Sequence, residues 1–303
     1  MLDGSQQWGV AAVTLEATIA LSIDQWRQNA KHFEFEGLKI AYWTAGKGKP
    51  LLMVHGFPTS SWDWVPVWDR LSRNHMLIAA DMIGFGLSDK PQSGYSIHRQ
   101  TDMQLALLRH IGVDQFDAVV HDYGVSVGQE MLARQQEHSG AEGLGRMVFL
   151  NGGIFPDQHR ARPIQKLGAS PLGFLVSRLL KRESFAKSFS AVFGPETKPG
   201  ERELDEFWSL ITEQDGNRIF HKLLHYIGDR QEHKKRWITA LENADKRVGL
   251  INGAKDPVSG EHAFNRWVEC VPEAHAYLLP HIGHYPQVEA PEKVASLILE
   301  WLS

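Results

Sequence analysis

A carboxylate at the end of a buried strand pattern is the strongest candidate for a nucleophile in this chain. The apolar run at 117–120 is followed by HDYG at 121–124, and a helical pattern comes next. Where a strand turns sharply into a helix, the side chain at the turn is exposed above the carboxyl ends of the strands. We therefore predict that Asp122 is the nucleophile. The alternative role of such an aspartate is to cap the following helix.

A serine pattern overlaps this turn. Residues 124–128 read GVSVG and match G-x-S-x-G, the pattern around the nucleophilic serine of many hydrolases. Because the apolar strand pattern ends at Val120, the tight turn falls at Asp122, and Ser126 would lie one helical turn later. The spacing favours Asp122, and ester hydrolysis through Ser126 remains an alternative.

An acid and a histidine follow two later strand patterns, in the order that a nucleophile at this turn requires. Asp256 comes after GLINGAK and His284 after YLLPHIG. A carboxylate holds a histidine in one tautomer and one orientation, so that the ring can activate water as a general base. Alone, Asp256 would be a turn-forming Asp-Pro and His284 a loop histidine. Their joint occurrence predicts a triad with Asp122.

Two backbone amides are predicted to stabilise an oxyanion beside this triad. His55-Gly56-Phe57 follows the apolar run LLMV, and Gly56 lets the backbone turn so that the amide of Phe57 can face the site. The amide of Tyr123, directly after the nucleophile, would be the second donor.

The strands that must position these residues are short, nearly continuous apolar runs, typical of strands buried on both faces of a parallel sheet. An alternating pattern around Glu36-Gly37 predicts an antiparallel hairpin before them. Helical patterns at 65–72, 97–111 and 291–302 alternate with the runs, which predicts an α/β fold built from crossover units. The runs are PLLMVHG (50–56), HMLIAADMIG (75–84), DAVVHDYG (117–124), GRMVFLNGG (145–153), RVGLINGAKDP (247–257) and AHAYLLPHIGH (274–284).

The alternation stops between residues 154 and 246, where helical, charged and aromatic stretches contain no strand pattern. We predict a helical cap over 154–246, inserted after the sixth core strand, with the α/β core at 33–153 and 247–303. We also predict an N-terminal helical segment over residues 1–32. Its apolar stretch at 8–23 is interrupted by Glu16 and is too short to span a bilayer. A helix packed on the core is favoured over one that lies on a membrane surface or a partner.

Composition narrows the partners and the compartment. The net charge of -4 provides no basic field for nucleic acid or anionic lipid. The single cysteine, Cys270, cannot form an internal disulfide, so a reducing cytoplasm is the expected compartment.

Five motifs resemble the epoxide hydrolase and haloalkane dehalogenase branch of the α/β-hydrolase superfamily. More narrowly, HGFPTSSWDW, HDYG, NGGIFP (151–156) and HYPQVE (284–289) resemble the family of mesoderm-specific transcript proteins. The similarity extends from about residue 33 to the C-terminus. The five motifs are HGFPTSSWDW (55–64), DMIGFGLSDKP (81–91), HDYG (121–124), GAKDP (253–257) and GHYPQVEAP (283–291).

This resemblance implies an α/β-hydrolase fold with a mostly parallel eight-stranded sheet, helices on both faces and an inserted helical cap. It also implies catalysis without a cofactor, in two steps. The aspartate attacks carbon to form an alkyl ester, and water activated by the histidine hydrolyses that ester.

Departures from the branch concern the substrate. Many relatives have Trp directly after the nucleophile, where its indole N–H helps to hold a halide, and other dehalogenases have Asn after the His-Gly pair. This chain has Tyr123 and Phe57 at those positions, which weakens the prediction of dehalogenation. Epoxide hydrolases generally use two cap tyrosines to bind the epoxide oxygen, whereas Tyr226 is the only tyrosine in 154–246. The other cap donors predicted to contact substrate are Trp208, His221 and His225.

No metal site is predicted. His221 and His225 share a helix face, but the glutamate of H-E-x-x-H is missing. The sequence therefore predicts a cofactor-independent hydrolase that acts with water on a small apolar electrophile, with epoxides preferred. Haloalkane dehalogenation, ester hydrolysis through Ser126 and a binding or membrane-associated module without catalysis are the alternatives.

Overall fold

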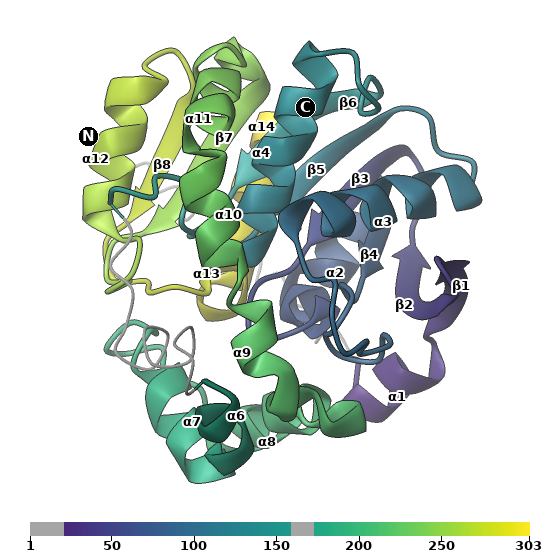
Figure 1. The fold of residues 1–303 in the computed structure, drawn as a ribbon. Helices are drawn as coiled ribbons and strands as arrows, with labels where there is room; N and C mark the ends of the chain where they lie inside the picture. Colours follow the sequence, from purple (N-terminus) through teal and green to yellow (C-terminus); the bar gives the residue numbers. More distant parts are fainter. Residues whose placement is uncertain (1–20, 159–172) are drawn as a thin grey trace, which may run out of the picture.

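Eight strands form one mostly parallel sheet in the computed structural model, which describes residues 21–158 and 173–303. The strand order is β1-β2-β4-β3-β5-β6-β7-β8, and only the β1–β2 and β2–β4 pairs are antiparallel. This confirms the predicted α/β fold (Figure 1). The strands are β1 (Lys31–Phe35), β2 (Leu38–Ala45), β3 (Lys49–Val54), β4 (His75–Ala80), β5 (Phe116–Val120), β6 (Leu144–Phe149), β7 (Val248–Gly253) and β8 (His275–Leu279).

The first two strands form the hairpin that the alternating pattern predicts. Glu36 and Gly37 make the turn, with φ of 52° and 74°. Two positive φ values in succession match the right-handed twist of the two strands, and glycine adopts such values without steric cost. The second strand of the hairpin, β2, pairs with β4 and so joins the hairpin to the rest of the sheet.

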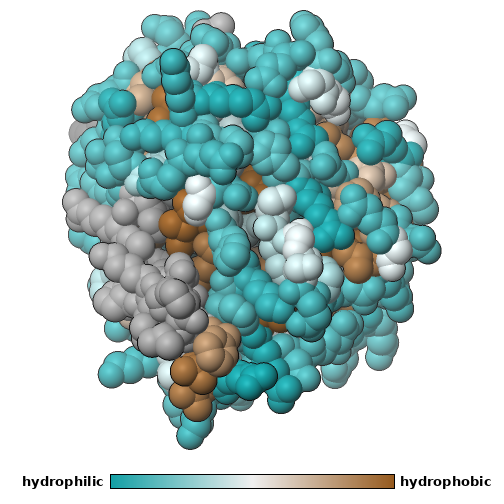
Figure 2. All heavy atoms as spheres, in the orientation of Figure 1, coloured by the Kyte–Doolittle hydropathy of each residue, from teal (hydrophilic) through white to brown (hydrophobic). Residues whose placement is uncertain are grey.

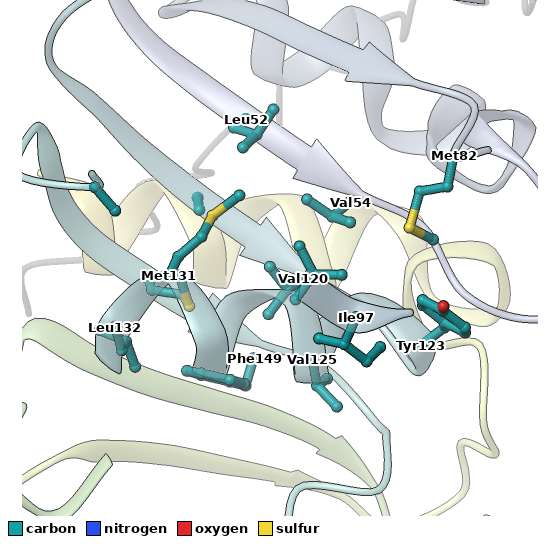
Figure 3. Close-up of a cluster of buried hydrophobic side chains, with 14 of the residues drawn as sticks. Leu52, Val54, Met82, Ile97, Val120, Tyr123, Val125, Met131, Leu132 and Phe149 are labelled. Atoms are coloured by element: carbon teal, nitrogen blue, oxygen red, sulfur yellow. The ribbon is translucent and has the colours of Figure 1, made fainter. Parts of the chain in front are cut away.

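Helices cover both faces of the sheet, and the alternation of side chains along each strand divides the core between the two faces. Leu52 and Val54 of β3 belong to the cluster under α3 and α4, whereas Leu51 and Met53 belong to the cluster under α2 and α14. Figure 3 shows Leu52, Val54 and Val120 in the first of these clusters, close to Tyr123 and Val125 of α4. The helices of the core are α1 (Ile23–Gln28), η1 (Ser61–Trp64), α2 (Val65–Ser72), α3 (Ile97–His110), α4 (Tyr123–Gln136), η3 (Asp245–Arg247), α12 (Glu261–Cys270), α13 (Pro286–Glu289) and α14 (Pro291–Leu302).

Between β6 and β7 the described part of the chain is helical and contains no strand. Figure 1 shows α6 to α9 at one end of the core, while α10 and α11 lie along α4. The indole N–H of Trp237 on α11 donates to Glu130 on α4 at 2.8 Å, which ties the two helices together. These helices are α6 (Gly173–Leu179), α7 (Arg182–Ser190), α8 (Glu201–Ile211), η2 (Glu213–Ile219), α9 (Phe220–Leu223), α10 (Tyr226–Glu232) and α11 (Lys234–Glu242).

The apolar stretch at 8–23 lies outside the described residues except for its last three. Helix α1 begins there, and its Trp26 is buried and stacks on Trp43 of β2 with ring centroids 4.4 Å apart. In the residues that the structure describes, no helix combines the length and apolar character needed to cross a membrane. On α6, Phe174, Leu175 and Leu179 are exposed, and Figure 2 shows hydrophobic atoms in this region on a largely hydrophilic face.

Candidate active site

The predicted nucleophile sits on a strained turn between β5 and α4. Asp122 has φ 46° and ψ -102°, and α4 begins at the next residue. A non-glycine residue with such a φ is costly and persists only where the surroundings fix it. Here the Asp122 amide donates to the carbonyl of Asn151 at 2.8 Å, and the Gly124 amide donates to the carbonyl of His121 at 2.7 Å. The side chain of Asp122 therefore projects from the carboxyl end of β5.

Two glycines let three backbone segments meet at this turn. A Cβ atom on Gly124 would lie 2.4 Å from the carbonyl oxygen of Val54, at the end of β3. A Cβ on Gly56 would lie 2.7 Å from the Cβ of Asp122. Any larger residue at either position would push the loop after β3 away from the turn. Gly56 in HGF and Gly124 in HDYG thus allow Phe57 to lie next to Asp122.

The structure brings together the three side chains of the predicted triad. Nε2 of His284 lies 3.6 Å from Oδ1 of Asp122, and Nδ1 of His284 lies 2.7 Å from Oδ2 of Asp256. All three residues are at most 5% exposed. They follow the carboxyl ends of β5, β7 and β8. They meet because parallel strands place these ends at one edge of the sheet.

The charged groups of the triad shift one another's pKa values. Burial alone would lower the pKa of His284, but the Asp256 and Asp122 carboxylates raise it to about 10. Burial alone would likewise raise the pKa of Asp122, but His284 and the guanidinium of Arg230 hold it well below its usual range. These shifts favour an ionised Asp122 beside a protonated His284.

Asp256 is fixed by a set of donors that the sequence analysis did not identify. Its carboxylate accepts from the side-chain amide of Asn151 at 3.0 Å, from the hydroxyl of Ser259 at 2.6 Å and from the amide of Val258 at 2.7 Å. Oδ1 of Asn151 also accepts from the amide of Gly253 at 2.6 Å. Asn151 was recognisable as the first polar residue after a buried strand. Together these donors stabilise the ionised form of Asp256 and its orientation toward His284.

A second imidazole lies behind the triad. Nε2–H of His121 donates to the carbonyl oxygen of His284 at 2.8 Å, and Nδ1 of His121 lies 3.8 Å from a carboxylate oxygen of Asp63. Asp63 also accepts from the hydroxyl of Thr59 at 2.6 Å. His121 precedes Asp122 directly in the chain, so this hydrogen bond links the loop that carries Asp122 to the loop that carries His284.

One of the two predicted oxyanion donors contacts the carboxylate of Asp122. The amide of Phe57 donates to Oδ2 of Asp122 at 2.9 Å. Tyr123 is fully buried as the first residue of α4, and its ring lies 4.7 Å from the ring of Tyr226. The amide of Tyr123 is at a helix N-terminus, where the first backbone N–H groups have no acceptor within the helix.

The predicted cap residues lie in different environments. Tyr226 is 1% exposed, and its ring centroid lies 6.3 Å from that of Phe57. Trp208 is half-buried and packs on Phe185, while the half-buried His221 shares a hydrogen bond of 3.1 Å with the hydroxyl of Ser177. His225 is exposed. The structure thus brings Tyr226 to the residues around Asp122, places Trp208 and His221 in other contacts and leaves His225 at the surface.

Ser126 lies inside α4 and not at its start. It is fully buried, and its hydroxyl accepts from Nε of Arg230 on α10 at 2.7 Å. Nη2 of the same guanidinium donates to the carbonyl of Asp122 at 2.8 Å. Arg230 was not predictable from the sequence, because a single arginine in a charged helical stretch is ordinarily a surface residue.

No group of three or more metal-ligating side chains is present in 21–158 and 173–303. Nε2 of His284 faces Asp122, and its Nδ1 is occupied by Asp256. This arrangement suits proton transfer and nucleophilic attack by a carboxylate.

Comparison with known proteins decides the family. A family model described as the alpha/beta hydrolase family matches residues 51–297. The chain belongs to the α/β-hydrolase family. Within this family it is similar to the human mesoderm-specific transcript homolog protein, with 37% identity over 94% of this chain and 91% of that protein. The resemblance predicted from the motifs is thereby confirmed.

Other relatives in the α/β-hydrolase family carry names of specific activities. A cis-3-alkyl-4-alkyloxetan-2-one decarboxylase of Shewanella oneidensis is 29% identical over 90% of this chain and 88% of that protein. The relatives also include a haloalkane dehalogenase of Mycolicibacterium paratuberculosis, with 27% identity over 84% of this chain and 83% of that protein. A soluble epoxide hydrolase of Corynebacterium is 36% identical over 30% of this chain and 32% of that protein. Among solved structures, the epoxide hydrolase CorEH matches with a TM-score of 0.72 and 21% identity, over 90% of this chain and 97% of that one. That likeness shows the shared fold.

Proposed function

We propose that this α/β-hydrolase forms a covalent alkyl ester on Asp122 and hydrolyses it with water activated by His284. The observation that carries the proposal is the environment of the Asp122 carboxylate. One of its oxygens accepts from the Phe57 amide at 2.9 Å, and the other lies 3.6 Å from Nε2 of His284. An ionised carboxylate beside an imidazole and an oxyanion donor can serve both steps.

The first step forms a carbon–oxygen bond. A carboxylate oxygen of Asp122 attacks an sp3 carbon of the substrate, the bond from that carbon to the leaving atom breaks, and the leaving atom takes the electron pair. With an epoxide, the leaving oxygen stays attached to the substrate and gains a proton. The strain of the three-membered ring lowers the barrier to its opening.

The second step returns the enzyme to its starting state. His284, oriented by Asp256 through the 2.7 Å hydrogen bond, removes a proton from water, and the resulting hydroxide adds to the ester carbonyl of Asp122. The amide of Phe57, with that of Tyr123 as the second donor, stabilises the oxyanion. Collapse of the intermediate expels the alcohol and restores the carboxylate, so that an epoxide and one water give a diol.

Epoxides remain the preferred substrate class in this proposal, and haloalkanes are the alternative. Tyr123 and Phe57 stand where many dehalogenases have Trp and Asn, whereas Tyr226 brings a hydroxyl group to the vicinity of Asp122. Serine-type hydrolysis is less well supported, because the hydroxyl of Ser126 is engaged by Arg230 inside α4.

A single turnover in H₂¹⁸O tests the proposed mechanism. With enzyme in excess over a short terminal epoxide, water attacks the ester carbonyl and not the substrate carbon. We therefore expect ¹⁸O in the peptide that contains Asp122 and unlabelled oxygen in the diol, as measured by mass spectrometry. Label that enters the diol in the first turnover, with none in the peptide, would contradict a covalent intermediate on Asp122.

The two steps should differ in their dependence on pH. Alkylation needs ionised Asp122, whose pKa lies well below its usual range, so its rate constant should stay level between about pH 5 and about pH 8. Hydrolysis needs neutral His284. The ester removes the negative charge of Asp122, which is one cause of the raised pKa of about 10, so the pKa of His284 falls in the alkyl-enzyme.

The hydrolysis rate constant should therefore rise with pH through a pKa below about 10, and the ester should accumulate in acid. Stopped-flow tryptophan fluorescence with excess substrate, supported by quenched samples analysed by intact mass, separates the two rate constants. If the rate constants of alkylation and of hydrolysis both fell in acid with the same pKa, this would argue against the assignment of His284 to the hydrolysis step alone.

A further inference from the structure

Arg230 is a buried cation without a counter-ion among its direct contacts. It is 2% exposed on α10, and it forms no ion pair with any carboxylate in the described part of the chain. By contrast, Arg134 and Arg236 on the neighbouring helices α4 and α11 pair with glutamates. Burial of a charge is costly unless the charge is compensated. The position of Arg230 therefore calls for an explanation in terms of what it binds.

Two nitrogens of this guanidinium hold the turn that carries the nucleophile. Nε donates to the hydroxyl of Ser126 at 2.7 Å and Nη2 donates to the carbonyl of Asp122 at 2.8 Å. Both acceptors are neutral oxygens. Because one of these acceptors is the carbonyl of Asp122, the positive charge lies next to this residue. There it helps to keep the pKa of the Asp122 carboxyl low.

The third nitrogen is a buried donor without an acceptor. Nη1 of Arg230 has no hydrogen-bond partner within the described residues, and the same holds for the hydroxyl of Tyr226. The guanidinium carbon lies 4.4 Å from the centre of the Tyr226 ring, so the two groups are stacked. Buried donors of this kind are nearly always satisfied in a working protein. The Tyr226 hydroxyl lies close enough to the guanidinium for Arg230 to counteract part of the rise in its pKa, and both groups act on Asp122 electrostatically. A charged donor and a hydroxyl, next to each other and to Asp122 and both without a hydrogen-bond acceptor, form a place for an acceptor atom of a ligand.

We infer that Arg230, assisted by Tyr226, binds the oxygen anion that leaves the reacting carbon, and that this selects strained oxygen heterocycles over haloalkanes as substrates. This inference rests on the proposed function. Asp122 forms a bond to carbon, the ring carbon–oxygen bond breaks, and the electron pair goes to the ring oxygen. From an epoxide this oxygen is an alkoxide, which takes the hydroxyl proton of Tyr226, and the resulting tyrosinate regains a proton from water; from a four-membered lactone opened at its sp3 carbon it belongs to a carboxylate.

The chemistry of the leaving atom explains the selection. A compact oxygen anion concentrates charge and makes short, charge-assisted hydrogen bonds, which suit a guanidinium. A bromide or iodide is large and is a weaker acceptor. Because the guanidinium is charged and already held by Asp122 and Ser126, it needs no reorganisation when negative charge develops. Removal of the Arg230 guanidinium should therefore lower the rate of alkylation far more for substrates with an oxygen leaving group than for those with a halide.

The test compares leaving groups on one alkyl skeleton. In a His284→Ala background, which stops the reaction at the ester, alkylation rate constants are measured by intact mass for 1,2-epoxyhexane, 4-propyloxetan-2-one and 1-bromohexane. Adding Arg230→Gln should lower the rate for the epoxide and the lactone by about 10²- to 10³-fold, the usual effect of losing one oxyanion donor. The rate for the bromide should fall by less than about tenfold, and Arg230→Lys should restore part of the loss.

Two further variants separate leaving-group binding from a structural role. Ser126→Ala removes the acceptor of Nε but keeps the charge and the hydrogen bond from Nη2 to Asp122, and should change the ratio of epoxide to bromide rates far less than Arg230→Gln does. Tyr226→Phe keeps the stacked ring and should slow alkylation by the epoxide and the lactone but not by the bromide. This variant keeps the inference testable if Arg230→Gln does not fold. An equal fall for all three leaving groups would overturn the inference and assign Arg230 to holding the turn. If the His284→Ala parent gives no adduct with any substrate, the proposed function fails instead.

Discussion

Asp122→Ala should reduce turnover of a confirmed substrate by about 10⁴-fold or more, because it removes the atom that attacks carbon in the proposed mechanism. No other carboxylate in the described residues combines contact with an oxyanion amide and proximity to Nε2 of His284. The fold should persist, since the turn is held by backbone hydrogen bonds to Asn151 and His121. Steady-state kinetics and thermal unfolding followed by circular dichroism measure both effects.

Ser126→Ala is the matched control for this variant. Ser126 lies one helical turn along α4, is equally buried and belongs to the competing G-x-S-x-G pattern. Because the carbonyl of Asp122 still holds Arg230, this variant should lose far less activity than Asp122→Ala, and its turnover should stay within about tenfold of the wild-type rate. The opposite pattern, with activity retained in Asp122→Ala and lost in Ser126→Ala, would make the serine the nucleophile and the enzyme an esterase.

His284→Ala should convert the enzyme into one that reacts once and stops. Alkylation needs only the carboxylate of Asp122, whereas hydrolysis loses its general base and should slow by about 10³-fold. After incubation with a panel of epoxides, haloalkanes and activated esters, intact mass should reveal one adduct per chain, and peptide mapping should locate it on Asp122.

The mass of the adduct identifies the reaction. An increment equal to a whole epoxide supports epoxide hydrolysis, whereas an alkyl increment without halogen means dehalogenation. His281→Ala, which changes an exposed histidine in the same loop, should accumulate no adduct. An acyl group on Ser126 would replace the proposed nucleophile, and absence of any adduct across the panel would shift the balance toward a binding module.

Much of this site was predictable because the strands run parallel. Once the apolar runs at 117–120, 248–253 and 275–279 are read as parallel strands, the polar residues after them must converge at one edge. Asp122, Asp256 and His284 follow from that rule without knowledge of the packing. Asn151, after β6, obeys the same rule and was overlooked because asparagine has no catalytic role in such a triad.

The cap was less predictable. Tyr226, Trp208, His221 and His225 were chosen as polar or aromatic residues in the helical insertion, and the structure brings only Tyr226 of these to the residues around Asp122. A helix of seven residues such as α10 gives too few turns for its buried face to be read from periodicity. Which cap side chains reach the core depends on how the helices dock.

Local sequence patterns were sufficient to predict the α/β architecture, the turn that carries Asp122 and the order of the acid and the histidine that follow it. These features depend on local patterns of burial and on chain direction. Only the tertiary structure revealed the contact of Arg230 with the Asp122 turn and the link from His121 to the loop of His284. Both join residues more than 100 positions apart, and neither leaves a local pattern, because such pairs are set by the packing of one element against another.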